Sequence, residues 1–369
     1  MSTKKVRYFR DPTHPHLSAS SQLSLDLMDL AHAEISEIAA TGGPVSAFSS
    51  RYEALLTSDT VLTWRGNGPG AGRELRRSYS NIHGRVFARA YLEKIERVRG
   101  LIPIEGSYFQ FAPSTVVRLR DDEKGDMPDW IGWDASNFIV AEAKGTYAGG
   151  DWSKAFWHGY ALPQCLQKAQ QQVERVQIDI YGYALDVNFK SWSIASRWRT
   201  EENNFDPWLA AIDPVLGSSE TPRENFEIAV SNLLQEHLAR LLGTFGFSDD
   251  LPKLASKEAS IVRTERFNAR RDRWRELSFE DGRRVRGLNA AYADGFFIPI
   301  ENNEDLAFCK QVLSRDRPSW VATISDEVLK MAEEGQFIAD YADEKSEDYL
   351  SRNGMSLTQL DLVGEVSDL

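Results

Sequence analysis

The sequence predicts an α/β fold, because segments with helical apolar spacing alternate with short strand-like runs. The first such segment is an amphipathic helix from Ser80 to Val98. Two aromatic and aliphatic runs then follow, Trp130 to Trp133 and Phe138 to Ala141, separated by the turn-forming residues Asp134 to Asn137. A second helix is indicated by apolar residues at steps of three and four from Leu162 to Val176.

Residues 1–77 are predicted to form a helical N-terminal extension. An irregular arm over residues 1–19 precedes an amphipathic helix from Ser20 to Ala40, and a short helix follows from Ala47 to Leu56. Arg65 to Arg73 is the most glycine-dense segment, but it lacks the Gly-Lys-Ser/Thr of a phosphate-binding loop and the strand and spacing of a dinucleotide site. We interpret it as a connector.

Residues 78–200 are predicted to form the central domain. Ser107 to Leu119 is a strand before the hairpin, and Val187 to Arg199 is a strand after the second helix. The resulting element order is helix, three strands, helix and strand.

Residues 201–369 are predicted to be mostly helical with an acidic tail. The expected elements are a helix from Thr221 to Leu242, a strand from Ala291 to Ile300, a helix from Ser325 to Gly335, and an exposed or partner-facing end beyond Asp340.

Two acids and a lysine converge on the predicted hairpin. A turn centred midway along Asp134–Asn137 places Asp129 opposite Glu142. Strand alternation then places Lys144 on the same face as Glu142. Neighbouring carboxylates repel each other, and a divalent cation between them relieves this repulsion. Oxygen ligands with an open side suit Mg²⁺, and Lys144 adds a positive charge beside a bound phosphate or the attacking water.

Pro128-Asp129 followed by Glu142-Ala143-Lys144 after an apolar strand resembles the motif of the PD-(D/E)XK superfamily, the restriction-endonuclease-like nucleases. The three-residue part alone is uninformative, because Asp122-Glu123-Lys124 and Asp343-Glu344-Lys345 also fit it. Only the copy at 142–144 has an apolar run before it and a Pro-Asp pair one hairpin upstream. The resemblance covers about a third of the chain, and the alternative is an ordinary hairpin with surface charges.

The resemblance implies a restriction-endonuclease-like αβββαβ core with a mixed central sheet. It also implies metal-dependent hydrolysis, with Mg²⁺, or Mn²⁺ in its place, held by Asp129, Glu142 and the backbone carbonyl of Ala143. Lys144 completes the catalytic set by steadying the attacking water or the developing charge.

The resemblance also suggests a glutamine and a further acid beside the catalytic residues. Several branches of the superfamily carry a glutamine on the helix after the motif, which corresponds here to Gln167 or Gln171. The helix before the hairpin often adds an acid, for which Glu93 and Glu96 are candidates. The usual glycine-glutamate pair is here Gly84-Arg85, so this acid stays unassigned, and a solvated helix face is the simpler interpretation of both glutamates.

Composition limits the alternatives. The chain is 42% hydrophobic and 27% charged, without an apolar run long enough to span a membrane and without a secretory signal, so the expected location is the cytoplasm. Its two cysteines are too few for a disulfide framework or a cysteine zinc site.

The net charge of −12 is unevenly distributed, and two regions of the chain are basic. Twelve acidic and three basic residues lie between Ser325 and Leu369, which accounts for most of the excess. Arg65 to Arg99 holds nine basic and three acidic residues, and Arg263 to Arg286 holds nine arginines and five acids. The second region is either a nucleic-acid surface or a solvated, ion-paired helix.

The sequence thus predicts a magnesium-dependent nuclease, with DNA favoured over RNA as substrate and a role in defence against foreign DNA by analogy. One alternative is a non-catalytic nucleic-acid-binding or scaffolding subunit, and another is an RNA-cleaving toxin. The C-terminal region is a candidate for contacts with a second copy or a partner subunit.

Overall fold

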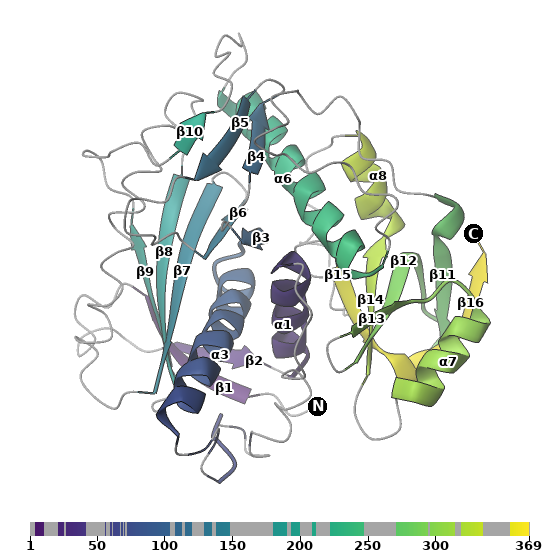
Figure 1. Ribbon diagram of the computed structural model, residues 1–369, viewed down its shortest axis with the longest axis horizontal. Coiled ribbons are helices and arrows are strands. Elements are labelled where there is room, and N and C mark those ends of the chain that lie inside the picture. Colours follow the sequence, from purple (N-terminus) through teal and green to yellow (C-terminus); the bar gives the residue numbers. More distant parts are fainter. Residues whose placement is uncertain are drawn as a thin grey trace.

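A computed structural model describes residues 4–10, 21–25, 27–41, 56, 60, 62–66, 68, 70, 72–103, 108–112, 115–119, 129–134, 138–147, 180–189, 193–199, 209–211, 222–246, 271–293, 296–313, 319–334 and 355–368. Over these residues the fold is mixed α/β, with a seven-stranded, a six-stranded and a three-stranded sheet and helices packed beside them (Figure 1). The α/β class predicted from the sequence is confirmed.

The largest sheet is built from β1 (Lys4–Arg10), β2 (Ser21–Leu25), β3 (Arg99–Pro103), β6 (Trp130–Trp133), β7 (Phe138–Thr146), β8 (Ile180–Asn188) and β9 (Ser193–Arg199). Its strand order is β2-β1-β9-β8-β7-β6-β3. β7 is parallel to β8 and β1 is parallel to β9, whereas the other neighbours are antiparallel. The sheet is therefore mixed.

The first two strands correct the prediction for the N-terminal region. An irregular arm and a helical extension are predicted there, but β1 and β2 form one edge of the large sheet. Val6, Leu23 and Leu25 alternate with exposed residues and are buried in the main core, which is why these segments adopt strands. The helix predicted for residues 47–56 lies outside the described residues except for Leu56.

Two predicted helices are confirmed with shifted bounds. They are α1 (Leu27–Thr41) and α3 (Arg73–Lys94). α3 ends earlier than predicted, and β3 follows it at once. Arg97 has φ 58° and Gly100 has φ 54°, so the backbone leaves the helix there and the apolar residues that follow are buried in the sheet.

Two strand predictions in the central region need correction. The segment predicted as one strand over residues 107–119 forms β4 (Tyr108–Ala112) and β5 (Thr115–Leu119), which pair with β10 (Leu209–Ala211) in the separate three-stranded sheet. The strand predicted over residues 187–199 is present as β9, while its first two residues belong to the end of β8, the antiparallel neighbour of β9. In each case residues of two different strands fall within the one predicted segment.

α3 packs closely on the face of β7 where the hairpin ends. A Cβ atom at Gly84 would lie 2.6 Å from Cα of Gly145, and one at Gly145 would lie 1.7 Å from the carbonyl oxygen of Ser80. Only glycines allow the two backbones to approach this closely. The residues on either side of Gly84 and Gly145 are therefore held next to each other.

In the described part of residues 201–369 a sheet accompanies the helices, whereas the prediction is a mostly helical region. This sheet is antiparallel and consists of β11 (Arg275–Phe279), β12 (Arg284–Ala293), β13 (Phe296–Pro299), β14 (Trp320–Ser325), β15 (Met355–Gln359) and β16 (Val363–Asp368). Short helices accompany them: η4 (Arg271–Arg273), α7 (Asn303–Leu313), α8 (Asp326–Glu334) and η5 (Leu360–Leu362).

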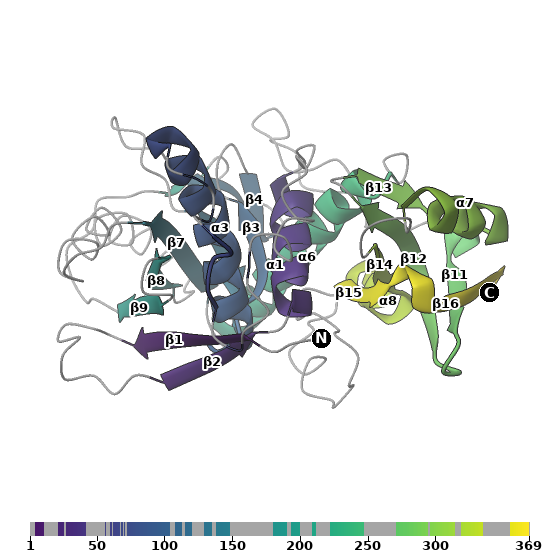
Figure 2. The same cartoon turned by 90° about the horizontal axis from the view of Figure 1, so that it is seen from below.

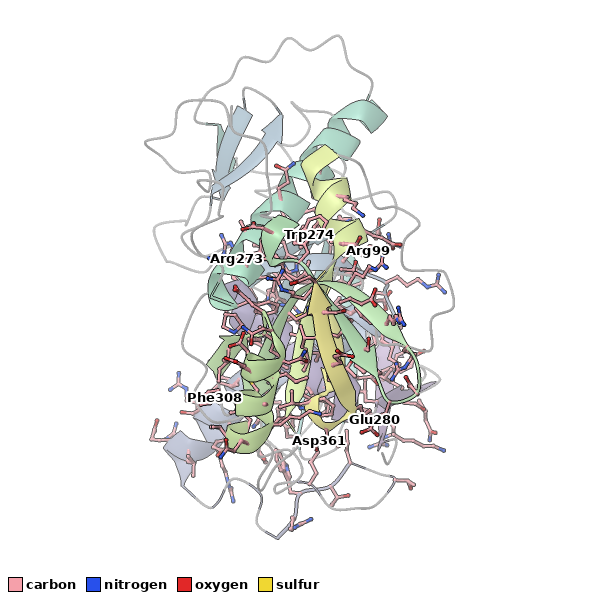
Figure 3. All side chains as sticks on the ribbon, turned by 90° about the vertical axis from the view of Figure 1, so that its right-hand side faces the viewer. Arg99, Arg273, Trp274, Glu280, Phe308 and Asp361 are labelled. Carbon is pink, nitrogen blue, oxygen red and sulfur yellow. The ribbon has the colours of Figure 1, made fainter. Side chains whose placement is uncertain are left out.

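Two features of this sheet explain the error. On β12 the exposed Arg284 and Arg286 flank Val285, which packs against the core, so a charged segment can still form a strand. The acidic tail is only partly exposed, because Val363 and Val366 of β16 are buried in the core of this sheet. Figure 3 shows Phe308 of α7 and Glu280 of the β11–β12 turn on either side of the strands.

The helix predicted from Thr221 to Leu242 is confirmed as α6 (Pro222–Thr244), and the helix predicted near residue 325 is confirmed as α8. α6 contacts β4, α1 and β3 on one side and α8 on the other, so it lies between the large sheet and the C-terminal sheet (Figures 1 and 2). No helix in the described part of the chain combines the length and the apolar character needed to cross a membrane.

Candidate active site

The β6–β7 hairpin has the register predicted from the sequence. Trp130 pairs with Ala141 at its open end, and the next position of the ladder places Asp129 opposite Glu142. Trp130, Trp133 and Phe138 are buried, so the hairpin is anchored in the core.

The two acids are fixed by backbone hydrogen bonds across the hairpin. The backbone N–H of Asp129 donates to Oε2 of Glu142 over 3.1 Å. The backbone N–H of Ala143 donates to Oδ2 of Asp129 over 2.8 Å. Asp129 lies just before β6, so its carboxylate can reach the backbone of β7, and the acids are adjacent as predicted.

Each acid also contacts a cation. Nζ of Lys144 contacts Oε1 of Glu142, and the side chain of Lys144 is 50% exposed. Nη1 of Arg85, on α3, contacts Oδ1 of Asp129, and the side chain of Arg85 is only 26% exposed. Lys144 thus faces solvent beside the acid pair, whereas Arg85 approaches from the interior. The structure brings together the three predicted catalytic residues.

Sequence reasoning missed Arg85 and Glu37 as residues of this site. Oε1 of Glu37, on α1, accepts a hydrogen bond from Nε of Arg85 over 2.6 Å, and its Oε2 accepts one from the indole N–H of Trp130 over 2.7 Å. Nη1 of Arg89 contacts the same Oε2 over 3.0 Å. Glu37 therefore orients Arg85, and Arg85 contacts Asp129.

A signal for Glu37 is present in the sequence. Leu30 and Ala33 of α1 are buried, and Glu37 continues the same helical spacing on this apolar stripe. An acid at a core position of a helix either pairs with a buried cation or retains its proton. The signal for Arg85 is its place directly after Gly84, which touches the end of β7.

Burial and mutual repulsion govern the protonation of the acids. Burial raises the pKa of Glu142 to about 7, and the charge of Asp129 adds to this increase. Burial also raises the pKa of Asp129, although the charge of Arg85 opposes the rise. For Arg85 itself, burial lowers the pKa, but the charges of Glu37 and Asp129 outweigh this effect and raise it. An acid pair of this kind favours a proton or a further cation.

The donor set at the hairpin fits a hard cation such as Mg²⁺. All four carboxylate oxygens of Asp129 and Glu142 accept one contact from the chain, and each retains a further lone pair. Mg²⁺ is usually bound by one or two carboxylates together with water and substrate phosphate. Over the described residues, no group of three or more His, Cys, Asp or Glu side chains could hold a metal ion, so the site offers this acid pair alone.

The other residues that were predicted for this site do not all lie in it or in the described part of the chain. Gln167 and Gln171 lie outside the described residues. Ala143 is buried, and its N–H, not its carbonyl, has the contact with Asp129 described above. Glu93 pairs with Arg89 over 2.9 Å, and Glu96 accepts a hydrogen bond from the hydroxyl of Tyr91 over 2.6 Å.

Comparison of the chain with known protein families, with curated proteins and with solved structures gives no match.

Proposed function

We propose that this chain is a metal-dependent nuclease of the PD-(D/E)XK type that hydrolyses phosphodiester bonds in DNA. The observation that carries the proposal is the convergence of Asp129, Glu142 and Lys144 on the β6–β7 hairpin, with the two acids joined by hydrogen bonds and the lysine open to solvent. Paired acids and an adjacent ammonium group are the residue types that this reaction needs.

The order of elements supports a restriction-endonuclease-like core. In the large sheet α3 is followed by β3, β6 and β7, with β4 and β5 inserted as part of the separate three-stranded sheet, and β8 then runs parallel to β7. A parallel connection needs a crossover of about a dozen residues or more, usually a helix, and residues 147–179 are long enough to provide one. The helix predicted around Gln167 and Gln171 would occupy this crossover.

In the proposed site, Asp129, Glu142 and the carbonyl of Ala143 hold Mg²⁺, for which Mn²⁺ can substitute. Bound Mg²⁺ lowers the pKa of a water molecule and offsets the charge of the substrate phosphate. Glu37 and Arg85 position Asp129 from the interior. Lys144, with its half-exposed ammonium group, orients the attacking water or stabilises the charge that develops on the phosphate.

The reaction is a hydrolysis. The oxygen of water forms a new bond to phosphorus while the bond from phosphorus to the leaving oxygen breaks. The water loses a proton, and the leaving oxygen gains one. No redox partner is needed.

The test is cleavage of supercoiled and linear DNA by the purified protein, with Mg²⁺, with Mn²⁺ and with a chelator. Lys144→Ala is compared with Lys330→Ala, a matched control in which a 46% exposed lysine pairs with Asp326 on α8. We expect metal-dependent cleavage that Lys144→Ala lowers by about 100-fold or more and Lys330→Ala leaves unchanged.

Two results would contradict the proposal. Equal cleavage by the wild-type protein and Lys144→Ala would move the reaction away from this hairpin. Binding of DNA without cleavage of either DNA or RNA under any metal condition would favour the non-catalytic binding subunit. Cleavage of RNA alone would retain the site and change the substrate.

A further inference from the structure

The first two turns of α3 carry three arginines on the protein surface. Arg73, Arg76 and Arg77 are all exposed, and Glu74 is the acid in the first turn of the helix. Nε of Arg76 donates to the carbonyl oxygen of Gly70 over 2.7 Å. Among the ion pairs between described residues, none involves Arg73 or Arg77. This group is therefore a patch of positive charge.

The other basic region predicted from the sequence has a different character. On the β11–β12 hairpin, Arg286 and Arg284 both pair with Glu276, over 2.7 Å and 3.2 Å. Arg283 pairs with Asp281 over 2.5 Å. These arginines are offset by acids of the same hairpin, which corresponds to the ion-paired alternative and weakens their attraction for an outside anion.

The arginine patch of α3 adjoins the proposed nuclease site. Gly145 directly follows Lys144 and touches the carbonyl of Ser80, which lies one helical turn after Arg76 and Arg77. Figures 1 and 2 show the start of α3 beside the large sheet and far from the C-terminal sheet. The end of β7, which carries Lys144, therefore packs against the first turns of α3.

An aromatic stack holds the chain after Lys144 in place against this helix. The ring of Tyr147 stacks on Trp64 and Phe189, with centroid distances of 5.7 Å and 5.6 Å. Burial raises the pKa of the Tyr147 hydroxyl, and the charge of Arg76 opposes that rise, so Arg76 lies within electrostatic range of Tyr147. The chain just after Lys144 is therefore packed against the main core.

We infer that Arg73, Arg76 and Arg77 bind the phosphate backbone of DNA beside the proposed nuclease site. The inference rests on the proposed function, and it assigns the substrate-binding surface to α3 rather than to the C-terminal sheet. Guanidinium groups pair with phosphate oxygens in a bidentate manner and do not read bases from this position. The surface therefore supplies affinity without sequence selectivity.

The test measures binding separately from cleavage. Fluorescence anisotropy with a labelled DNA duplex is recorded in Mg²⁺ over a range of salt concentrations for Lys144→Ala, and for the same variant with Arg73→Ala and Arg77→Ala added. A matched control carries Arg284→Ala and Arg286→Ala instead. All three proteins are compared by circular dichroism, and because the substituted arginines are exposed we expect the fold to be retained.

We expect the α3 double substitution to weaken binding roughly 10-fold. It should also reduce the slope of log affinity against log salt by about 1.8, because each phosphate contact contributes about 0.9. The hairpin control should bind like the parent protein.

Unchanged affinity and salt slope in the α3 variant would overturn the inference, as would a greater loss in the hairpin control. Neither result depends on cleavage. Loss of binding in the α3 variant alone, in a protein that never cuts, would support the surface and reject the nuclease proposal.

Discussion

Two hairpins of this chain each hold a glutamate next to cations, and the pKa values of the two glutamates move in opposite directions. In the β6–β7 hairpin, burial raises the pKa of Glu142 to about 7, and the nearby Asp129 adds to the rise. In the β11–β12 hairpin, the hydrogen bond from Arg286 lowers the pKa of Glu276 and outweighs its desolvation. Desolvation, reinforced by a second acid, dominates at the first hairpin, whereas hydrogen bonds and charges from two arginines dominate at the other.

The arginines at the two hairpins also differ in their exposure to solvent. The side chains of Arg284 and Arg286 are 69% and 59% exposed, so water and salt screen their interaction with Glu276. Arg85 reaches Asp129 from the interior. The comparison teaches that abundant charge does not identify a functional site, whereas like charges that are held together under partial burial do.

The largest difference between the hairpins should appear in catalysis. Glu142→Gln keeps the size of the side chain but removes the charge that holds Mg²⁺, so we expect cleavage of DNA to fall about 100-fold or more. Glu276→Gln should cleave at the wild-type rate. The initial rates at which the two variants cleave supercoiled DNA test this prediction. Similar losses of rate in both variants would show that the two hairpins do not differ in catalysis.

A third glutamate isolates the effect of burial. Glu34 of α1 is 2% exposed, its Oε2 has no hydrogen-bond partner among the described residues, and burial raises its pKa from 4.5 to about 8. Above about pH 4.5 the unfolded chain releases this proton while the folded protein retains it. The free energy of unfolding should therefore fall as pH rises from about 4.5 to 8, by on the order of 4 kcal/mol from this group.

Urea unfolding of the wild-type protein and of Glu34→Gln over this pH range measures the effect. The glutamine variant should show a flatter dependence, since its side chain stays neutral in both states. A pH dependence identical to that of the wild-type protein would show that Glu34 is ionised in the fold.

The two kinds of arginine should differ in their contribution to stability. Arg85→Ala leaves Asp129 and Glu37 without their shared cation, so we expect a loss of about 2–3 kcal/mol, less than for a fully buried pair because Arg85 is partly exposed. Arg286→Ala should leave the melting temperature nearly unchanged. Calorimetry of both variants measures this difference in stability. A melting temperature of Arg85→Ala equal to that of the wild-type protein would mean that other groups neutralise the acids.

The smallest effect concerns glycines beside the two hairpins. Gly84→Ala forces a methyl group against the backbone at Gly145, and we expect a net loss of about 1–2 kcal/mol after the better helix propensity of alanine is included. Gly282, in the β11–β12 turn, has φ 86° and open space around it, so Gly282→Ala should cost about 1 kcal/mol from backbone strain alone. Only Gly84→Ala should also slow cleavage, because it displaces α3 from β7.

Several elements could be predicted because their signals are local. The helical stripes of α1, α3, α6 and α8 repeat within a few turns, and their presence is confirmed with bounds shifted by the neighbouring strands. β1, β2 and the C-terminal sheet were not predictable in the same way. Their strands are short, and charged residues alternate with the apolar ones, so only pairing with distant strands determines them.

The sequence by itself determined the β6–β7 hairpin and the meeting of Asp129, Glu142 and Lys144, because the turn residues and the period of two along each strand set the register within a short segment. Only the tertiary structure decided that Glu37 and Arg85 join them. These residues come from two helices that converge on the hairpin through close packing at Gly84 and Gly145, and such convergence depends on contacts between segments far apart in the chain.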